Sequence, residues 1–243
     1  MQKATKSSPA YARILLKFSG EALMGQESFG IDAQVLQAVT AKVKYLMDAQ
    51  VEVALVVGGG NIFRGAGLTA SGINRVTGDQ MGMLATTMNA LAIKDGLQQA
   101  GLSAKVLSAI DMPSMCEKYS RDKAVNYLQT KNVVIFAGGT GNPFFTTDTA
   151  ASLRAIEINA DLMIKATKVD GIYDSDPIKN PEAKRYTQLS FDDAIAQQLG
   201  VMDLTAMILC RDHKMPIRVL DMNHAEDLFD LVIAGQSVGT LVS

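Results

Sequence analysis

Short apolar runs alternate along the chain with longer segments whose apolar positions repeat at helical spacing. Four of the runs are apolar nearly throughout, as expected for strands that are buried on both faces of a parallel sheet. They cover residues 12–18, 51–57, 133–137 and 162–166, and the shorter runs 104–107 and 217–220 are further strand candidates. The alternation predicts an α/β fold, a three-layer αβα sandwich with a mainly parallel central sheet.

Helices are predicted between these strands. Residues 32–50 repeat apolar positions at helical spacing behind Asp32, which suits an N-cap. A longer helix over 78–100 carries an apolar face that we interpret as core or subunit-contact filling. That face consists of Met81, Leu84, Met88 and Leu91. Further helices are predicted over 121–129, 148–159, 190–199, 204–213 and 225–234. Segment 169–189 lacks a clear period and contains Asp-Pro and Asn-Pro steps, so it is predicted to be a long loop.

Length and composition favour one domain over 12–243, preceded by a flexible tail over 1–11. The chain has 243 residues, of which 48% are hydrophobic, enough for a full core. A formal charge of −2 argues against general nucleic-acid or membrane-surface binding, which requires a basic excess. The two cysteines, Cys116 and Cys210, have no metal or disulfide spacing. No secretory signal or membrane span is present in the sequence, so we expect a cytosolic protein.

Three glycine-rich turns follow three of the predicted strands. Lys17 ends the first strand before Ser-Gly, and such a turn can hold a polyphosphate by charge and backbone N–H groups. The second turn has three glycines, 58–60, with Arg64 behind them. The third, 138–148, combines glycines with hydroxyl, amide and acid groups at a strand end, where open α/β sheets bind anionic ligands. The simpler alternatives are a solvent-facing lysine, a flexible turn, and a strand-to-helix turn with Thr147 as N-cap.

Known phosphate-binding signatures narrow the possibilities. The chain contains no Gly-Lys pair, so the Walker A motif of P-loop NTPases is excluded. The stretch 65–70 matches a dinucleotide fingerprint only formally, because it does not directly follow a strand. The protein-kinase signature set is absent. His213 and His224 lie late in the chain and are expected at the surface or at helix caps. The residues alone therefore predict a parallel α/β protein that binds a nucleotide or phosphate without a P-loop.

In their order along the chain, the motifs resemble those of the bacterial uridylate (UMP) kinases of the amino acid kinase fold. The matching segments are 17–21, 58–65, 78–83, 141–148 and 165–171, and the likeness runs from Arg13 to Leu241. The resemblance implies transfer of the γ-phosphoryl group of ATP, with Mg²⁺, to UMP in pyrimidine nucleotide biosynthesis. It further implies a homohexamer that GTP activates and UTP inhibits.

The resemblance also implies roles for individual residues. The ATP-side positions are Lys17, Phe18, Ser19, Gly20, Gly60, Arg64, Thr167, Tyr173 and Asp176. The UMP-side positions are Gly59, Asp79, Thr140, Gly141, Asn142, Pro143, Phe144, Phe145, Thr146 and Thr147, with Asp79 on the ribose. The GTP-effector region falls on Gly25, Gln26, Glu27, Ser28, Phe29 and Gly30. By the same resemblance, the N-terminal part carries the UMP side and the oligomer contacts, and residues from about 160 to 243 carry the ATP side.

The implied chemistry needs cations more than a base. A phosphate monoester is mostly dianionic at neutral pH, so its oxygen can attack without losing a proton. We expect Lys17 to neutralise the transferred group and Arg64 to clamp phosphate, with Lys165 as a second cation. Asp148 is expected to orient these cations or to help Mg²⁺ through water, because Mg²⁺ uses few protein ligands.

Two other functions stay open at this point. Another member of the fold could phosphorylate a carboxylate such as acetylglutamate or aspartate, although 78–79 and the loop 141–148 favour a nucleotide. Alternatively, the chain is a nucleotide-sensing regulator that has lost turnover. Retention of Lys17, Arg64, Asp79 and Asp148 argues against that loss.

Overall fold

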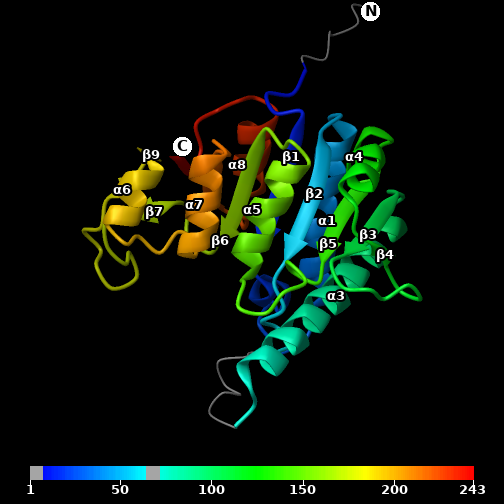
Figure 1. The fold of residues 1–243 in the computed structure, drawn as a ribbon. Helices are drawn as coiled ribbons and strands as arrows, with labels where there is room; N and C mark the ends of the chain where they lie inside the picture. The colour runs from blue at the N-terminus through cyan, green and yellow to red at the C-terminus, as the bar shows by residue number, and fades with distance from the viewer. Residues whose placement is uncertain (1–7, 64–71) are drawn as a thin grey trace, which may run out of the picture.

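A mostly parallel sheet forms the centre of the molecule, whose computed structural model describes residues 8–63 and 72–243 (Figure 1). Its strands are β1 (Arg13–Phe18), β2 (Glu52–Val57), β3 (Ala104–Ser108), β4 (Glu117–Lys118), β5 (Val133–Ala137), β6 (Leu162–Thr167), β9 (Gln188–Leu189), β10 (Ile217–Asp221) and β11 (Thr240–Val242). Their order is β4-β3-β5-β2-β1-β6-β10-β11-β9. Each neighbouring pair is parallel except β10 and β11.

Helices cover both faces of this sheet. One face carries α1 (Ala33–Asp48), α3 (Arg75–Gln99) and α8 (Ala225–Val232). The other carries α4 (Arg121–Gln129), α5 (Thr147–Glu157), α6 (Phe191–Ala196) and α7 (Leu204–Asp212). A short 3₁₀ helix, η1 (Gly20–Leu23), follows β1, and β7 (Ile172–Tyr173) pairs with β8 (Arg185–Tyr186) in a separate antiparallel hairpin. The predicted three-layer α/β architecture is confirmed.

Strand alternation divides the core into two clusters. In β1, Ile14 and Phe18 belong to the cluster under α1, α3 and α8, whereas Leu15 belongs to the cluster under α4 to α7. All three side chains are buried, because helices cover the sheet on both sides. This double burial explains why the central strands are apolar at nearly every position.

The predicted long strands are confirmed to within about a residue at each end, but the shortest elements were missed. Strands β4, β9 and β11 have two or three residues each, too few to show a period of two. The predicted long loop over 169–189 is interrupted by the two-residue strands of the β7–β8 hairpin and by β9, which the prediction missed. Asp32 caps α1 as predicted, accepting hydrogen bonds from the N–H groups of Gln34 and Val35.

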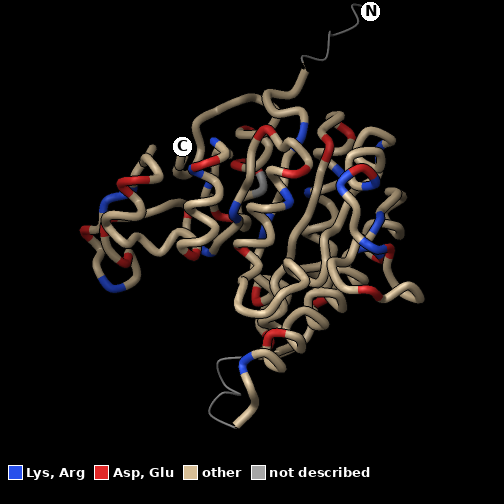
Figure 2. The backbone as a smooth tube through the Cα atoms, in the orientation of Figure 1, with Lys and Arg blue, Asp and Glu red and all other residues tan. Residues whose placement is uncertain are grey.

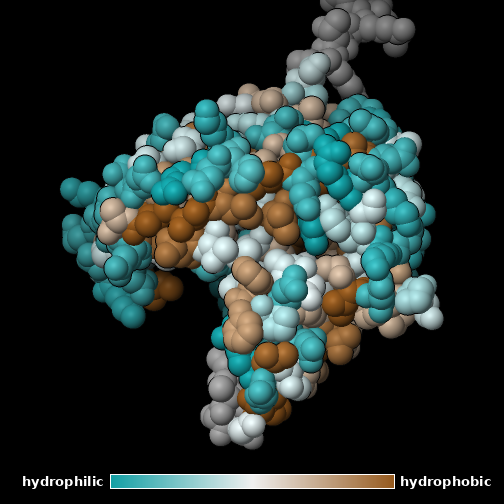
Figure 3. Space-filling view, in the orientation of Figure 1, coloured by the Kyte–Doolittle hydropathy of each residue, from teal (hydrophilic) through white to brown (hydrophobic). Residues whose placement is uncertain are grey.

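The face of α3 that we assigned to the core is largely exposed. Met81, Leu84 and Met88 are 37, 49 and 54% exposed, and Figure 3 shows hydrophobic side chains on the projecting part of this helix. The buried side chains, among them Ala90 and Ile93, lie on another face. Apolar residues surround α3, so helical spacing alone cannot identify the core side. The core interpretation is wrong for Met81, Leu84 and Met88 but correct for Leu91, which packs against the core, and the subunit-contact interpretation stays a prediction.

The start of the described chain is tied to α8. The N–H groups of Ala10 and Tyr11 donate to the carbonyl oxygens of Ile233 and Val232, while residues 1–7 of the expected tail lie outside the described residues. Within the described ranges, no helix is long and apolar enough to cross a lipid bilayer.

The turn before β11 packs closely against β10, and substitutions of glycine test this packing. Gly239 has φ +68°, and a Cβ there would overlap the Val219 carbonyl oxygen of β10. Gly101 has φ +82° with open space around it, so it carries the backbone strain without the clash. We expect Gly101→Ala to lower the free energy of unfolding by about 1 kcal/mol, and Gly239→Ala by more than about 2 kcal/mol. Urea denaturation measures both values, and equal losses would contradict this packing.

Candidate active site

Four neighbouring strands, β5, β2, β1 and β6, end at the same edge of the sheet, and the three glycine-rich turns follow three of them. Two of the turns touch one another. A Cβ on Gly20 would lie 2.5 Å from Asn61 Oδ1 and 2.6 Å from the Gly58 carbonyl oxygen. A Cβ on Gly59 would lie 2.8 Å from Ala85 Cβ of α3. Glycine is required at both positions because any side chain would separate the loops.

A charged cluster of Lys17, Asp148 and Lys165 lies beside these turns. Lys17 in β1 pairs in register with Lys165 in β6, so both side chains point to the same face of the sheet. Asp148, the second residue of α5, lies between them: its Oδ1 is 2.5 Å from Lys17 Nζ and its Oδ2 is 2.8 Å from Lys165 Nζ. All three side chains are largely buried, and two positive charges share one carboxylate.

Burial and charge act in opposite directions on this cluster. Burial alone would raise the pKa of Asp148, but Lys17 and Lys165 outweigh burial and hold that pKa below its usual value. Burial lowers the pKa of Lys165; Asp148 opposes this lowering and Lys17 adds to it. Asp148 is therefore ionised at neutral pH, and the cluster has an excess of positive charge, which suits an anionic ligand.

A cavity of about 360 Å³ lies between α3 and the loop after β5. It is lined by Gly59, Gly60, Phe63, Gly78, Asp79, Gly82, Met83, Thr86, Gly139, Thr140, Asn142, Phe145, Thr146 and Thr147. Seven of the ten residues predicted on the UMP side are among them, together with Gly60, which was predicted on the ATP side. Figure 3 shows the molecule hollowed beside the projecting part of α3. We call this space the first cavity.

A second cavity, of about 530 Å³, opens at the end of β6. Lys165 and Thr167 line it from β6, Tyr173 and Asp176 line it from the β7 region, and residues 197–201 line it from the end of α6. Thr167, Tyr173 and Asp176, three of the nine predicted ATP-side residues, are brought together here. Lys165 borders the second cavity and Thr147, next to Asp148, borders the first. The charged cluster thus lies between the two cavities.

The glycine turns are held by polar contacts that the sequence did not reveal. Buried Asn61 and Asn89 exchange amide hydrogen bonds of 2.9 and 2.7 Å, and Asn89 Nδ2 also donates to the Gly58 carbonyl oxygen. Thr86 Oγ1 accepts from the Gly138 N–H at 2.9 Å. Thr86 and Asn89 belong to a predicted helix, but that helix contains several other polar residues, so no distinct sequence signal marks these two. These contacts fix both turns to α3.

Asp203 makes a second set of contacts that sequence reasoning missed. It caps α7 by accepting from the Ala206 N–H, and it also accepts hydrogen bonds from the hydroxyls of Thr146 and Thr149 in α5. Thr146, not Thr147, is the N-cap of α5. Lys165 Nζ donates to the Val201 carbonyl oxygen just before this cap. Asp203 therefore ties the start of α5 to a wall of the second cavity.

Some predicted positions do not line either cavity. The Phe18 side chain is buried in the core, so only its backbone faces the edge of the sheet. Gly141, Pro143 and Phe144 are not among the lining residues of the first cavity. Arg64 and the formal fingerprint at 65–70 lie outside the described residues. Residues 25–30 line none of the described cavities and lie beside the Gly58 turn, where Gly30 exchanges hydrogen bonds with Asn61.

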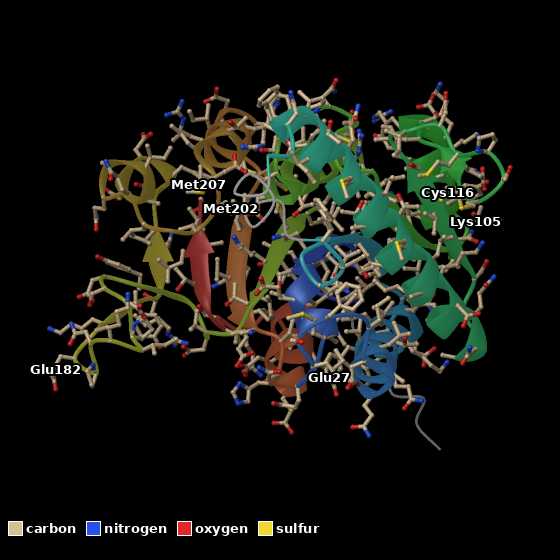
Figure 4. All side chains as sticks on the ribbon, turned by 90° about the horizontal axis from the view of Figure 1, so that it is seen from below. Glu27, Lys105, Cys116, Glu182, Met202 and Met207 are labelled. Atoms are coloured by element: carbon tan, nitrogen blue, oxygen red, sulfur yellow. The ribbon has the colours of Figure 1, made fainter. Side chains whose placement is uncertain are left out.

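A larger cavity of about 670 Å³ lies at the β3–β4 edge, away from this chemistry. Four lysines line it: Lys94, Lys105, Lys118 and Lys123. Lys105 and Cys116 mark its place in Figure 4, well apart from Glu27. None of the glycine turns borders it. We therefore place the chemistry at the two smaller cavities.

Charge and histidine placement agree with the sequence expectations. Basic and acidic residues are interspersed over the described part of the chain (Figure 2). His213 ends α7 and His224 precedes α8, and both are exposed cap positions.

Comparisons with known proteins agree with this arrangement. A model of the amino acid kinase family matches residues 12–221. The uridylate kinase of Ectopseudomonas mendocina is 56% identical over 241 residues, covering 99% of this chain and 97% of that protein. The uridylate kinase of Methylococcus capsulatus is 56% identical over 236 residues, covering 97% and 98%. The solved structure of a UMP kinase from Bacillus anthracis has a TM-score of 0.93 and 36% identity, and the match covers 96% of each chain.

The lowered pKa of Lys165 predicts how ATP binding changes with pH. The pKa of Lys165 lies below the ordinary lysine value of 10.5, so this side chain begins to lose its charge at a lower pH than an ordinary lysine. As the pH rises, ATP affinity should therefore begin to weaken at that lower pH. Lys165→Arg should remove this early weakening, since arginine keeps its charge. Asp148→Asn should shift the pH at which ATP affinity begins to weaken to a still lower value, because the Asp148 carboxylate raises the pKa of Lys165. Calorimetric titration between pH 7 and 10 measures this; an unchanged profile in both variants would contradict the assignment.

Proposed function

The chain belongs to the amino acid kinase family, and to the uridylate kinases within it, and from this we propose that phosphoryl transfer takes place at the charged cluster of Lys17, Asp148 and Lys165. The reaction is transfer of the γ-phosphoryl group of ATP to UMP, giving ADP and UDP. The observation that carries the assignment is the position of the cluster between two cavities, of which the first holds seven of the ten predicted UMP residues and the second holds Thr167, Tyr173 and Asp176 of the predicted ATP side.

Charge neutralisation is the main task in this reaction. The UMP phosphate attacks without losing a proton, since it is already mostly dianionic, and the obstacle is repulsion between two anions. Lys17 and Lys165 provide buried positive charge, and Asp148 holds both ammonium groups in place before the phosphates arrive. Backbone N–H groups of Gly59 and Gly60 add fixed donors, and Arg64 clamps phosphate near the point of transfer.

We assign the first cavity to UMP. Asp79 accepts hydrogen bonds from the ribose hydroxyls, and residues 140–147 surround the nucleotide. The lining of this cavity supports the assignment, because it contains Asp79, Thr140, Asn142, Phe145 and 146–147. The N-terminal part of the chain thus supplies the UMP side.

We assign the second cavity to the adenosine part of ATP. Thr167, Tyr173 and Asp176 are part of its polar lining, and every residue that lines it comes from the part of the chain after about 160. The triphosphate extends from there toward Lys165 and Lys17. At the end of β1, the backbone of 18–20 supplies further N–H donors.

Magnesium accompanies ATP in this proposal. Carboxylate oxygens are ligands that Mg²⁺ prefers, and both oxygens of Asp148 already contact ammonium groups, Oδ1 that of Lys17 and Oδ2 that of Lys165. Asp148 therefore fits a metal contact through water. Bound Mg²⁺ would neutralise part of the charge on the ATP phosphates. The described part of the chain contains no cluster of three or more His, Cys, Asp or Glu side chains that could hold a metal ion.

We further propose a cytoplasmic homohexamer regulated by GTP and UTP. The exposed face of α3 formed by Met81, Leu84 and Met88 supports subunit contacts. The two cysteines are free and buried, which agrees with a reducing compartment. For the effector region 25–30, the support is the pair of hydrogen bonds between Gly30 and Asn61, which links this region to the Gly58 turn.

A substrate panel separates this function from its rivals. We expect coupled ADP-release assays to show turnover with UMP and much less with CMP, acetylglutamate or aspartate, in the presence and absence of GTP. Lys17→Ala should lower kcat by roughly 100-fold or more, because it removes a charge that stabilises the transition state. Lys44→Ala, on the exposed side of α1, is the control and should leave kcat unchanged.

Three outcomes would overturn the proposal. Preference for acetylglutamate or aspartate would identify a carboxylate kinase. The absence of turnover with every substrate would indicate a nucleotide-sensing regulator. A loss below tenfold in folded Lys17→Ala would remove Lys17 from the mechanism.

A further inference from the structure

The Asp79 carboxylate is already engaged by two groups whose residues do not line the first cavity. Arg75 Nε lies 2.9 Å from Asp79 Oδ1 and 2.8 Å from Oδ2, one helical turn earlier in α3. The backbone N–H of Phe144, in the loop after β5, donates to Asp79 Oδ2 at 2.7 Å. Neither Arg75 nor Phe144 lines the first cavity, although Asp79 does. The carboxylate thus joins the α3 wall of the cavity to its loop wall.

Phe144 has an unfavourable backbone conformation at this contact. Its φ is +72°, a region that bulky L-residues avoid because Cβ comes too close to the following carbonyl. The side chain is 66% exposed, so burial of the ring does not compensate for the strain. The Arg75 guanidinium carbon lies 5.7 Å from the ring centroid, a weak cation–π contact at an exposed site. The charge-assisted hydrogen bond to Asp79 is therefore the main contact that holds Phe144 in this conformation.

We propose that Arg75, Asp79 and the Phe144 N–H form a latch that ties the 140–147 loop to α3 and orients Asp79 toward the ribose of UMP. The inference rests on the proposed function, in which the first cavity takes UMP. Arg75 acts through Asp79, so it is a positioning residue. The latch makes one carboxylate responsible for both loop placement and ribose recognition.

The hydrogen-bond capacity of Asp79 supports this double role. A carboxylate offers about four acceptor positions, two on each oxygen. The Arg75 N–H is shared between both oxygens and the Phe144 N–H uses Oδ2, which leaves one position on Oδ1. That position can accept a hydroxyl from the ribose while the latch stays closed. A carboxylate free to rotate would lack this fixed direction and would lose selectivity for ribose over deoxyribose.

An ordinary surface ion pair is the alternative explanation for Arg75. Pairs four residues apart on a helix are common and stabilise it little. Lys44 and Asp48 on α1 form such a pair at 3.6 Å, and within the described ranges neither side chain is hydrogen-bonded to a distant loop. The Arg75–Asp79 pair differs from it because Asp79 also accepts a hydrogen bond from the N–H of Phe144, which lies 65 residues later in the sequence. Lys44→Gln is therefore a matched control for Arg75→Gln.

Hydrogen exchange in the nucleotide-free protein tests the latch independently of the reaction. We expect amides of the 144–147 segment to exchange about tenfold faster in Arg75→Gln, and at the wild-type rate in Lys44→Gln. In a Phe144→Gly background, Arg75→Gln should have a smaller effect, because glycine adopts positive φ without strain. In a Phe144→Ala background, which keeps the strain and removes the ring, the full effect should persist. Equal exchange in Arg75→Gln and wild type would overturn the latch.

Kinetics test whether the latch orients Asp79. Arg75→Gln should raise KM for UMP about tenfold, leave KM for ATP within about twofold and narrow the preference for UMP over dUMP. Faster exchange with unchanged UMP kinetics would overturn the positioning role while leaving UMP as substrate. If the wild-type protein does not phosphorylate UMP, the proposed function fails instead, and the exchange data still decide whether the latch exists.

Discussion

One carboxylate held between two ammonium groups determines how this site is built. Asp148 reaches Lys17 and Lys165 only because β1 and β6 are neighbours in register and α5 begins directly above their ends. Burying such a cluster is costly, and ion pairs of this kind contribute little net stability. Under the proposed function, its value lies in keeping two positive charges fixed and partly dehydrated at the point where two anions meet. The surrounding loops, caps and hydrogen bonds keep this geometry in place.

The supporting contacts converge on the same few elements. Asn61 and Asn89 fix the Gly58 turn to α3, Thr86 fixes the turn after β5, and Asp203 fixes the start of α5 to α7. Each is a polar contact in a buried or half-buried position, where an unpaired partner would be costly. These contacts tie together the turns and helices that lie between the two cavities. The loop over 140–147, with its strained Phe144, is held mainly at its ends and at Asp79.

The sequence predicted the elements that follow a strong local pattern. The long central strands are buried on both faces and read as apolar runs, and glycines after β1, β2 and β5 point to close approach of backbone and ligand. Most of the candidate site could be placed because parallel strands end at one edge. The orientation of α3 could not be predicted, since its apolar residues surround the helix. Strands of two or three residues carry too little pattern.

Contacts between segments that are distant in the sequence could not be predicted either. Asp203 lies 57 residues from Thr146, and Asp79 lies 65 residues from Phe144, so no local sequence pattern indicates either hydrogen bond. Arg75 lies before the predicted start of this helix at 78, so neither its pair with Asp79 nor the hydrogen bond from Phe144 was predicted. Such residues become interpretable only when the fold brings the segments together.

A crystal structure with UMP and a non-hydrolysable ATP analogue bound together tests the central claim most directly. The account predicts UMP in the first cavity, adenosine in the second, and the facing phosphates within hydrogen-bond distance of Lys17 Nζ and Lys165 Nζ. Nucleotides bound elsewhere, with both lysines still contacting Asp148 and neither contacting a phosphate, would contradict it.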